Sequence, residues 1–298
     1  MNTHSKTKHH LLMVFLVLIW GFEFAVRKDA LSLFDTVTLL CVKYGIGSVT
    51  IGILMFAMRD FVPLKLKDLP RVTLCALLGH LLYFYLEYEA MAFIPIANLT
   101  IILGLLPVAT VLVERMLFKR KFNKKLIIGM LVCFGGIIMV IGDNMGTGSI
   151  RGYIYCVIAV CSELGYLFAT QHVQKKYSSS SLAFYQCVIA FLVTLPHGAR
   201  HMPPLHLLMD TVLIIEILYI GILCVGIAFY LEILGIEHFG PIITGVYLNF
   251  LPVISSIGVF LIVHESLTIW QITGGIIVIA AGIMVIREKE RLNQIVVK

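Results

Sequence analysis

Residues 126–142 read LIIGMLVCFGGIIMVIG, a run in which no side chain is charged. A helix needs about 20 apolar residues to cross the roughly 30 Å hydrocarbon core of a bilayer. The rest of the chain has the same character: of 298 residues, 59% are hydrophobic and 13% are charged, and the mean hydropathy is +0.97. A soluble domain carries about 25% charged residues, and a disordered chain has low hydrophobicity, so both classes are excluded. The composition predicts an all-α protein that crosses a membrane several times.

Ten apolar segments are long enough to span a bilayer. Their approximate bounds are 11–31, 35–57, 72–92, 96–118, 126–142, 151–173, 181–197, 211–236, 241–263 and 269–287. The first segment is too long for a cleaved signal peptide and carries Trp20 and Glu23 inside it, so we interpret it as a permanent span.

Ten spans place both termini on one side of the membrane, and lysine and arginine indicate which side. With cytoplasmic termini, 17 of these residues fall in cytoplasmic segments and four in external ones. We therefore predict cytoplasmic termini and a multi-pass protein of the cytoplasmic membrane. The basic residues lie in short clusters such as 119–125 (KRKFNKK) rather than along a groove, so no nucleic-acid partner is expected.

An internal repeat relates the two halves of the chain at an offset of 145 residues. Residues 85–142 align with 230–287 without a gap, and 13 of the 58 aligned positions are identical. The predicted domains are a first five-helix repeat (1–142), a linker (143–150), a second five-helix repeat (151–287) and a cytoplasmic tail (288–298). Because five is odd, the second repeat is inverted in the membrane. Inverted repeats are typical of secondary transporters, since two pseudo-symmetric states can open to either side.

This organisation resembles the drug/metabolite transporter superfamily, EamA type. The resemblance is carried by Trp20-Gly21, the stretch from Ala90-Met91 to Ala97-Asn98, Pro107, Pro252, His264-Glu265, Gly129 and Gly274. Two positions depart from the family pattern: Arg120 stands where an acidic residue is common, and Lys43 where an arginine is usual. The resemblance implies export of amino acids, nucleotide-related metabolites, amines or drugs.

Ionisable residues inside the spans mark candidate sites, because each costs about 2.5–3.5 kcal/mol to insert and therefore needs a partner or a cavity. Glu23, Lys43 and Glu87 are expected at similar depth in the outer half of the membrane. A Glu23–Lys43 pair with Glu87 nearby is compatible with this spacing. Such a pair could join two helices, or it could bind substrate or protons; the sequence leaves both roles open.

Glu87 has a repeat partner in Glu232, expected on the opposite side of the membrane midplane. A buried carboxylate could bind a proton from one side and release it to the other. Our hypothesis is that Glu87 and Glu232 are gate residues that respond to protons or substrate; the alternative is a structural role at helix ends. Glu163, near the centre of the sixth span, is a further cavity candidate.

The remaining candidates are neutral or weakly basic. In an α-helix, His80, Tyr83, Phe84 and Glu87 share one face, which we expect to line the interior. Other candidate ligands are Asn98 and Asn249 as hydrogen-bond donors, and the aromatic residues Trp20, Tyr166, Tyr230 and Tyr247. Pro107 and Pro252 are hinge candidates, because proline removes a helix hydrogen bond.

No motif for another chemistry is found: there is no Walker A sequence, no H-E-x-x-H and no G-x-S-x-G. The seven cysteines lie in apolar stretches without C-x-x-C spacing, so no zinc site or disulfide framework is expected. We therefore predict no enzyme activity, no cofactor and no metal.

The predicted function is a secondary active transporter that exports a small polar or amphipathic metabolite, such as an amino acid, amine or drug. It would work by alternating access coupled to protons, through a cavity lined by spans one, three, four, six, eight and nine. Its partners would be the substrate, protons and lipid, and it would be a monomer or a weak homodimer. The alternatives are an uncoupled uniporter or exchanger, a membrane enzyme acting on lipid, and a non-transporting membrane protein.

Overall fold

The computed structural model of the protein describes residues 3–26, 28–94, 99, 102–118, 124–141, 148–204, 206–263 and 268–297. In the first half of the chain the elements are α1 (Thr3–Val26), α2 (Lys28–Leu33), α3 (Thr36–Met58), η1 (Leu66–Asp68), α4 (Leu69–Cys75), η2 (Ala76–Leu82), α5 (Tyr83–Met91), α7 (Leu106–Phe118) and α8 (Lys124–Ile141). In the second half they are α9 (Ile150–Gln174), α10 (Ser179–His201), α11 (Thr211–Leu218), η4 (Tyr219–Ile227), α12 (Ala228–Phe239), α13 (Pro241–Leu248), α14 (Leu251–Val263) and α15 (Ile269–Val297).

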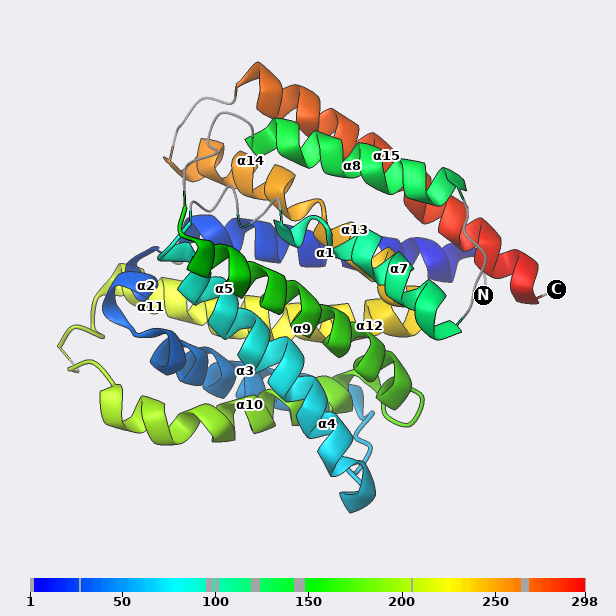
Figure 1. Cartoon of the computed structure of the whole chain (residues 1–298). Helices are drawn as coiled ribbons and strands as arrows, with labels where there is room; N and C mark the ends of the chain where they lie inside the picture. The colour runs from blue at the N-terminus through cyan, green and yellow to red at the C-terminus, as the bar shows by residue number, and fades with distance from the viewer. Residues whose placement is uncertain are drawn as a thin grey trace.

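These elements form an all-helical bundle, and the described residues contain no strand (Figure 1). Seven helical stretches in the described part of the chain are long and apolar enough to cross a membrane. They are Thr36–Met58, Leu66–Met91, Ile150–Gln174, Ser179–His201, Thr211–Phe239, Pro241–Gly258 and Ile269–Leu292.

Short polar residues fix where several helices begin. Asp35 accepts hydrogen bonds from the backbone N–H groups of Val37 and Thr38 at the start of α3. Ser149 and Ser178 cap α9 and α10 in the same way, and Asp210 caps α11. Each side chain satisfies a backbone donor that the first turn of a helix leaves without a partner. The helices therefore start where capping residues precede apolar runs.

Two of the expected spans, the fourth and the ninth, are interrupted in the structure. The fourth, expected over 96–118, has a turn at residues 104–105 before α7. The ninth, expected as one helix over 241–263, is interrupted by a turn at Asn249–Phe250 that separates α13 from α14. An apolar run predicts burial in lipid, but it does not reveal a break that the packing of neighbouring helices supports.

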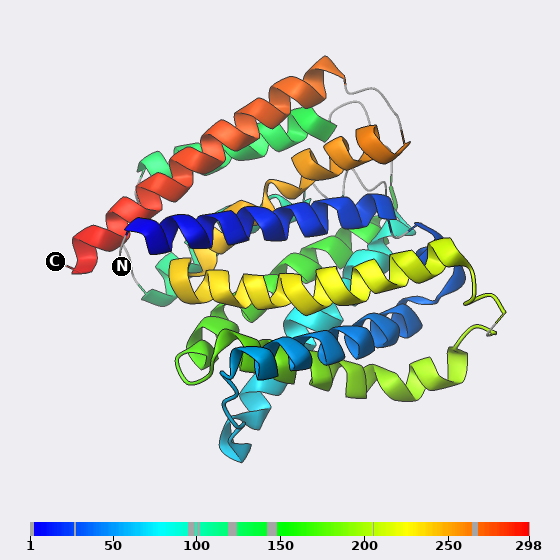
Figure 2. The same ribbon diagram turned by 180° about the vertical axis from the view of Figure 1, so that it is seen from behind.

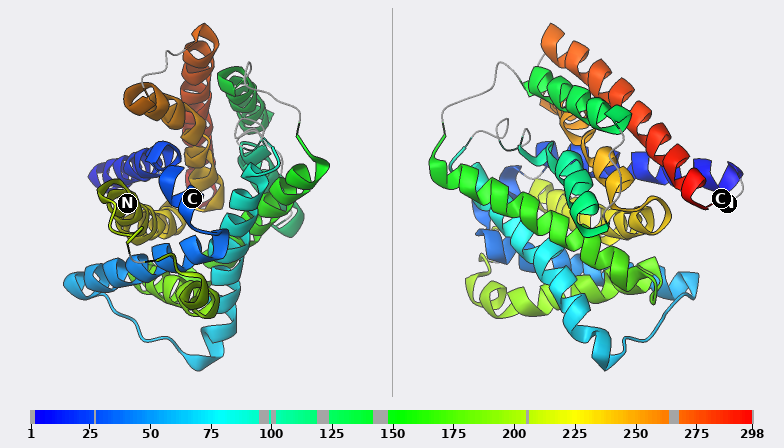
Figure 3. Two further views of the ribbon diagram at one scale, coloured as in Figure 1. Left: turned by 90° about the vertical axis from the view of Figure 1, so that its left-hand side faces the viewer. Right: turned by 45° about the vertical axis from the view of Figure 1, so that its right-hand side comes forward.

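Equivalent helices of the two halves pack against each other. α3 pairs with α10, and α8 pairs with α15. Viewed along the bundle, these two pairs lie at opposite edges, with the other long helices between them (Figure 3, left). The α8–α15 contact is close: a Cβ atom on Gly274 would lie 2.6 Å from the carbonyl oxygen of Gly136. Only glycine fits at that position without moving the helices apart.

The beginning of α1 and the end of α15 lie at the same end of the bundle (Figure 2). There the Nε2 atom of His10 lies 3.6 Å from a carboxylate oxygen of Glu290. An even number of crossings between the two termini is consistent with this arrangement.

Both halves depart from regular α-helix at equivalent positions. The π-helical segments η2 and η4 end at Leu82 and Ile227, which lie 145 residues apart. The turn at residues 104–105 precedes α7, and the turn at 249–250, again 145 residues later, precedes α14. The internal repeat seen in the sequence is therefore accompanied by matching departures from regular α-helix.

Candidate functional site

A cavity lies between the two halves, with about 70 Å³ open to the centres of water molecules. It is lined by Trp20, Glu23, Tyr83, Phe84, Glu87, Leu103, Gly104, Leu106, Val160, Glu163, Phe229, Glu232, Leu248, Asn249, Leu251 and Pro252. These residues come from the six spans expected to line it, the first, third, fourth, sixth, eighth and ninth. Ligand sites usually enclose about 300 Å³ or more, so this conformation has room for a few waters only.

Repeat-equivalent positions form much of the cavity wall. Five pairs of lining residues lie 145 positions apart: Phe84 and Phe229, Glu87 and Glu232, Leu103 and Leu248, Gly104 and Asn249, Leu106 and Leu251. Ten of the sixteen lining residues thus occupy equivalent positions in the two halves, which gives the cavity an approximate two-fold relationship between its two ends.

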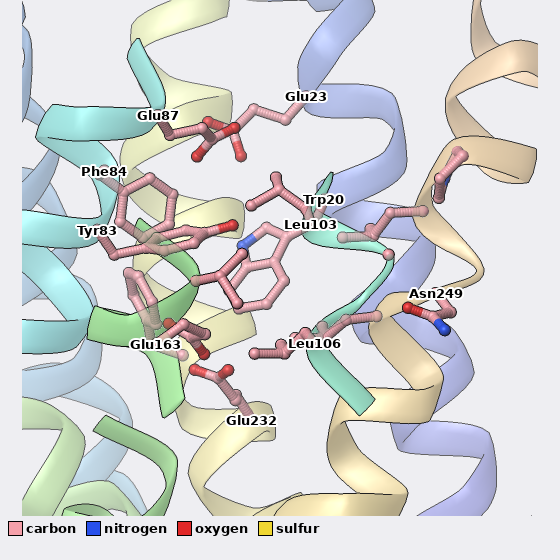
Figure 4. Close-up of a pocket in the computed structure, with 16 residues that line it drawn as sticks. Trp20, Glu23, Tyr83, Phe84, Glu87, Leu103, Leu106, Glu163, Glu232 and Asn249 are labelled. Atoms are coloured by element: carbon pink, nitrogen blue, oxygen red, sulfur yellow. The ribbon is translucent and has the colours of Figure 1, made fainter. Parts of the chain in front are cut away.

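Four buried glutamates line the cavity in two pairs (Figure 4). The carboxyl groups of Glu23 and Glu87 lie together at one end, and those of Glu163 and Glu232 lie together at the other. All four side chains are at most 5% exposed. Within each pair, one glutamate comes from the first long helix of a half and the other from the third. The fold therefore gives each half its own pair of acids.

The carboxyl groups of Glu163 and Glu232 lie close together in the cavity (Figure 4). Two ionised carboxylates can only accept hydrogen bonds, so these two groups could bond to each other only if one of them carried a proton. The hydroxyl of Tyr166 donates to Oε2 of Glu232 over 3.0 Å. Tyr166 therefore supplies a hydrogen-bond donor to this pair of acids.

The Glu23–Glu87 end is connected to a buried cation. The hydroxyl of Tyr88 donates to Oε1 of Glu23 over 3.3 Å, and Nζ of Lys43 donates to the Tyr88 oxygen over 3.1 Å. The Lys43 ammonium also lies 3.6 Å from the ring centroid of Phe84. Tyr88 thus links the two residues that the sequence suggested as a pair. Sequence reasoning missed Tyr88, although its i, i+4 spacing from Phe84 was a usable signal.

Aromatic rings separate the two acid pairs. Trp20, Tyr83 and Phe84 lie between them in the cavity (Figure 4). Nε1 of Trp20 donates to the carbonyl of Cys224 over 2.9 Å, within the π-helical segment η4, which fixes the indole across the two halves. The ring of Phe229 meets those of Trp20 and Phe84 in T-shaped contacts at centroid distances of 5.5 and 5.7 Å. Sequence reasoning also missed Phe229, which its register with Phe84 could have indicated.

His80 is buried in the interior, as expected, but it is not among the residues that line the cavity with Tyr83, Phe84 and Glu87. It lies behind the wall, where its ring packs 4.2 Å from Phe229 and its Nε2 meets Oε1 of Gln186 at 3.2 Å. The reason is the π-helical segment η2: its i→i+5 hydrogen bonds disrupt the 3.6-residue spacing on which the prediction rested.

Three other candidate side chains have contacts elsewhere. The hydroxyl of Tyr230 lies 3.8 Å from the sulfur of Met58, and Tyr230 is absent from the cavity wall. Tyr247, also outside the wall, hydrogen-bonds with Nδ1 of His10 over 2.6 Å. Asn249 lines the cavity, and its amide donates to the sulfur of Cys133 over 3.7 Å. Asn98 lies outside the described residues.

Both hinge-candidate prolines lie in the first turn of a helix rather than in its middle. Pro107 is the second residue of α7, and Pro252 is the second residue of α14. Proline is tolerated there because the first-turn N–H groups have no intrahelical acceptor. Each proline follows a turn that already breaks the span, and its role as a hinge stays a prediction.

Known proteins place this chain in a family. The EamA-like transporter family matches residues 7–142 and again residues 150–287. An uncharacterized transporter of Archaeoglobus fulgidus is 18% identical over 285 residues, which cover 95% of this chain and all of that protein. The uncharacterized transporter YvbV of Bacillus subtilis is 21% identical over 300 residues, covering 99% and 96% of the two chains.

A solved structure described only as a crystal structure of a protein has the same fold, with a TM-score of 0.78 at 16% identity. The similarity covers 93% of this chain and 98% of that one. Two family matches that together span nearly the whole chain agree with the bundle and its repeated irregularities. The chain belongs to the EamA-like transporter family of the drug/metabolite transporter superfamily, and it is a multi-pass membrane transporter.

Proposed function

We propose that the protein is a secondary active transporter that exports a small polar or amphipathic metabolite by alternating access, coupled to protons. The observation that carries the proposal is the cavity with one buried carboxyl pair at each end, each pair supplied by one half of the chain. The proposed substrates are amino acids, amines or drugs. The transporter acts as a monomer or a weak homodimer in the cytoplasmic membrane.

The proposed topology is ten spans with cytoplasmic termini, formed by inverted repeats 1–142 and 151–287, the linker 143–150 and the tail 288–298. The shared 145-residue register of the π-helical segments and of the turns supports two homologous halves. The excess of basic residues on one side supports the orientation. In this orientation, the Glu163–Glu232 pair is nearer the cytoplasm and the Glu23–Glu87 pair nearer the outside.

The acid pairs suggest how protons and substrate exchange. A proton shared by Glu163 and Glu232 removes their mutual repulsion, and so does a positively charged group of a substrate. Binding of one therefore opposes binding of the other, which is the coupling that proton antiport needs. The aromatic wall favours a cationic or zwitterionic substrate, since an ammonium group interacts well with the faces of Trp20 and its neighbours.

The small cavity requires a conformational change before a metabolite can enter. The turns at 104–105 and 249–250 interrupt the fourth and ninth spans beside the cavity, just before Pro107 and Pro252. We infer that these turns are the pivots, because the regular α-helical hydrogen bonding is interrupted there by i→i+3 bonds, such as Phe250 N–H to the Tyr247 carbonyl over 3.0 Å. Small dihedral changes at such a turn move the adjoining half-helices.

Transport by purified protein in liposomes tests the proposal. Uptake of labelled amino acids and amines into the liposomes is measured with and without a pH gradient across the membrane. We expect gradient-driven accumulation, and at least a tenfold loss of it in Glu232→Gln and in Glu163→Gln. Glu288→Gln, on α15 away from the cavity, should retain the wild-type rate.

Equal rates with and without the gradient would favour the alternative of an uncoupled uniporter or exchanger. If Glu232→Gln and Glu163→Gln both accumulated substrate along the pH gradient as well as the wild type, the carboxyl pair would not have its proposed role.

A further inference from the structure

A groove lies between α8 and α15, outside the central cavity. It has about 510 Å³ open to the centres of water molecules. The two helices lie side by side at one edge of the bundle (Figure 1), and the groove is near the end where α8 begins and α15 finishes. The chain termini lie at this same end (Figure 2). The groove shares no residue with the cavity, so it is a separate candidate site.

Most of the groove is formed by one face of α15. Six lining residues follow each other along this helix with the spacing i, i+3, i+4, i+7, i+8 and i+11, which keeps them on one side of an α-helix. They are Ala280, Ile283, Met284, Arg287, Glu288 and Arg291. Over about 16 Å the stripe changes from three apolar residues to three ionisable ones. From α8, Ile128 lines the groove as a further apolar residue and Lys125 as a further charged one.

The apolar part of the groove belongs to a membrane span, because the apolar stretch Ile269–Leu292 contains it. Ile128, Ile283 and Met284 are 57%, 43% and 46% exposed. Exposed apolar side chains within a span contact the acyl chains of the surrounding lipid. The small side chain of Ala280 leaves space between its larger neighbours. This part of the groove is therefore suited to hold an acyl chain.

The ionisable part of the groove carries excess positive charge. Lys125, Arg287 and Arg291 give three positive charges against the one negative charge of Glu288. The Glu288 carboxylate lies 3.1 Å from Nη2 of Arg291, whose side chain is 60% exposed. A guanidinium has five N–H donors, so Arg291 can bind a second anion besides this carboxylate. The charge of this part is complementary to an anionic group.

The opposite face of α15 uses its positive charge differently. Lys289 stands two residues from both Arg287 and Arg291, which places it on the far side of the helix. It is 8% exposed, and its Nζ donates to Oε2 of Glu114 over 2.8 Å. The charge of Lys289 is thus neutralised inside the bundle, whereas the two arginines carry theirs to the groove.

We propose that this groove binds a phospholipid with a negatively charged headgroup. Phosphate oxygens accept hydrogen bonds from Arg287 and Arg291, Lys125 adds attraction from α8, and one acyl chain lies along the apolar part. Basic pockets between transmembrane helices bind anionic headgroups in other membrane proteins. The lipid comes from the leaflet nearest the chain termini, which is the cytoplasmic leaflet in the proposed orientation. A soluble phosphate would leave the apolar part uncovered.

Lipid binding to the full-length purified protein in detergent micelles tests the proposal. Phosphatidylglycerol and phosphatidylcholine with identical acyl chains are titrated separately, and the bound lipid is counted by native mass spectrometry. We expect phosphatidylglycerol to bind at least fivefold more tightly. An excess of glycerol 3-phosphate should not displace it, because that ion has no acyl chain. Equal affinity for the two lipids, or displacement by glycerol 3-phosphate, would overturn the proposal.

A charge variant locates the headgroup. In the double variant Arg287→Gln/Arg291→Gln, the preference for phosphatidylglycerol should fall below twofold; both side chains are exposed, so folding should not change. The matched control is Lys65→Gln/Lys67→Gln, which removes two exposed charges from the loop between α3 and α4. Its preference should stay within twofold of wild type. A preference that survives the arginine substitutions, or that the control loses equally, would contradict the assigned site.

A second variant locates the acyl chain. Ala280→Phe places a ring in the apolar part and should weaken binding of phosphatidylglycerol at least fivefold. Ile279→Phe is its control, because Ile279 is exposed on the neighbouring face and does not line the groove. Equal effects of the two substitutions would contradict the proposal. If the spectra instead show a dimer that Ala280→Phe abolishes, with no lipid preference, the groove is an interface between two copies of the chain and the lipid proposal is wrong.

Discussion

Phe84 and Phe229 occupy the same register in the two halves of the chain, and their rings meet edge to face with centroids 5.7 Å apart and planes at 88°. Both line the cavity, and Phe84 also stacks beneath the ammonium group of Lys43. The two halves therefore contact each other at the cavity through one equivalent pair of side chains, while their acids remain at opposite ends.

The connection between Lys43 and Glu23 through Tyr88 gives a prediction for stability. In a double-mutant cycle of Lys43→Met and Glu23→Gln, we expect a coupling free energy of about 0.5–3 kcal/mol. In a Tyr88→Phe background the coupling should be smaller, because the bridging hydroxyl is absent. The coupling free energy is measured by reversible unfolding of the variants in mixed micelles. Undiminished coupling without the hydroxyl would show that Tyr88 does not carry the connection.

The close approach of α8 and α15 predicts the effect of two glycine substitutions. Gly274→Ala should lower the free energy of unfolding by about 1–3 kcal/mol, because the added Cβ meets the backbone of Gly136 at 2.6 Å. Gly135→Ala on α8 is the control: a Cβ there has nothing within 4 Å, so stability should be unchanged or slightly increased. Equal effects of the two substitutions on thermal unfolding would contradict this contact.

Asp35 predicts a pH dependence of stability. Burial raises the pKa of Asp35, but hydrogen bonds from Thr38 and the contact with His197 outweigh burial and hold this pKa below its ordinary value of 3.8. A lowered carboxyl pKa stabilises the folded state above pH 3.8, and this stabilisation is lost as the pH falls through the folded-state pKa.

Asp35→Asn keeps a capping side chain and removes the titration. Wild type should therefore be more thermostable than Asp35→Asn at pH 6, and the difference should narrow by pH 3. A difference that is constant across this range would be evidence against the Asp35 contribution.

The proposed orientation predicts which loops face the cytoplasm. In a Cys161→Ser background, Lys65→Cys should react with an impermeant thiol reagent only from the cytoplasmic side. Arg200→Cys should react only from the outside. Both positions are exposed, and the other cysteines are buried. Labelling in intact cells and in inverted vesicles shows from which side each cysteine reacts. The reverse pattern would mean that the termini lie outside.

The sequence by itself determined that this is an all-helical membrane protein with an internal repeat. The excess of apolar residues excludes a soluble protein. Identical residues at an offset of 145, such as Glu87 and Glu232, reveal the register of the repeat. It also identified the four acids that line the cavity, because buried charges in a membrane span are costly unless they have a role.

Only the tertiary structure decided which of these residues meet. Spans that are apolar on nearly every face carry little information about which side faces a neighbour, so the pairing of Glu163 with Glu232 could not be read from their spacing. The π-helical segment η2 removed His80 from the face that α-helical periodicity assigned it, and Tyr88 inserted between Lys43 and Glu23. These outcomes depend on contacts between helices far apart in the chain, which local patterns do not encode.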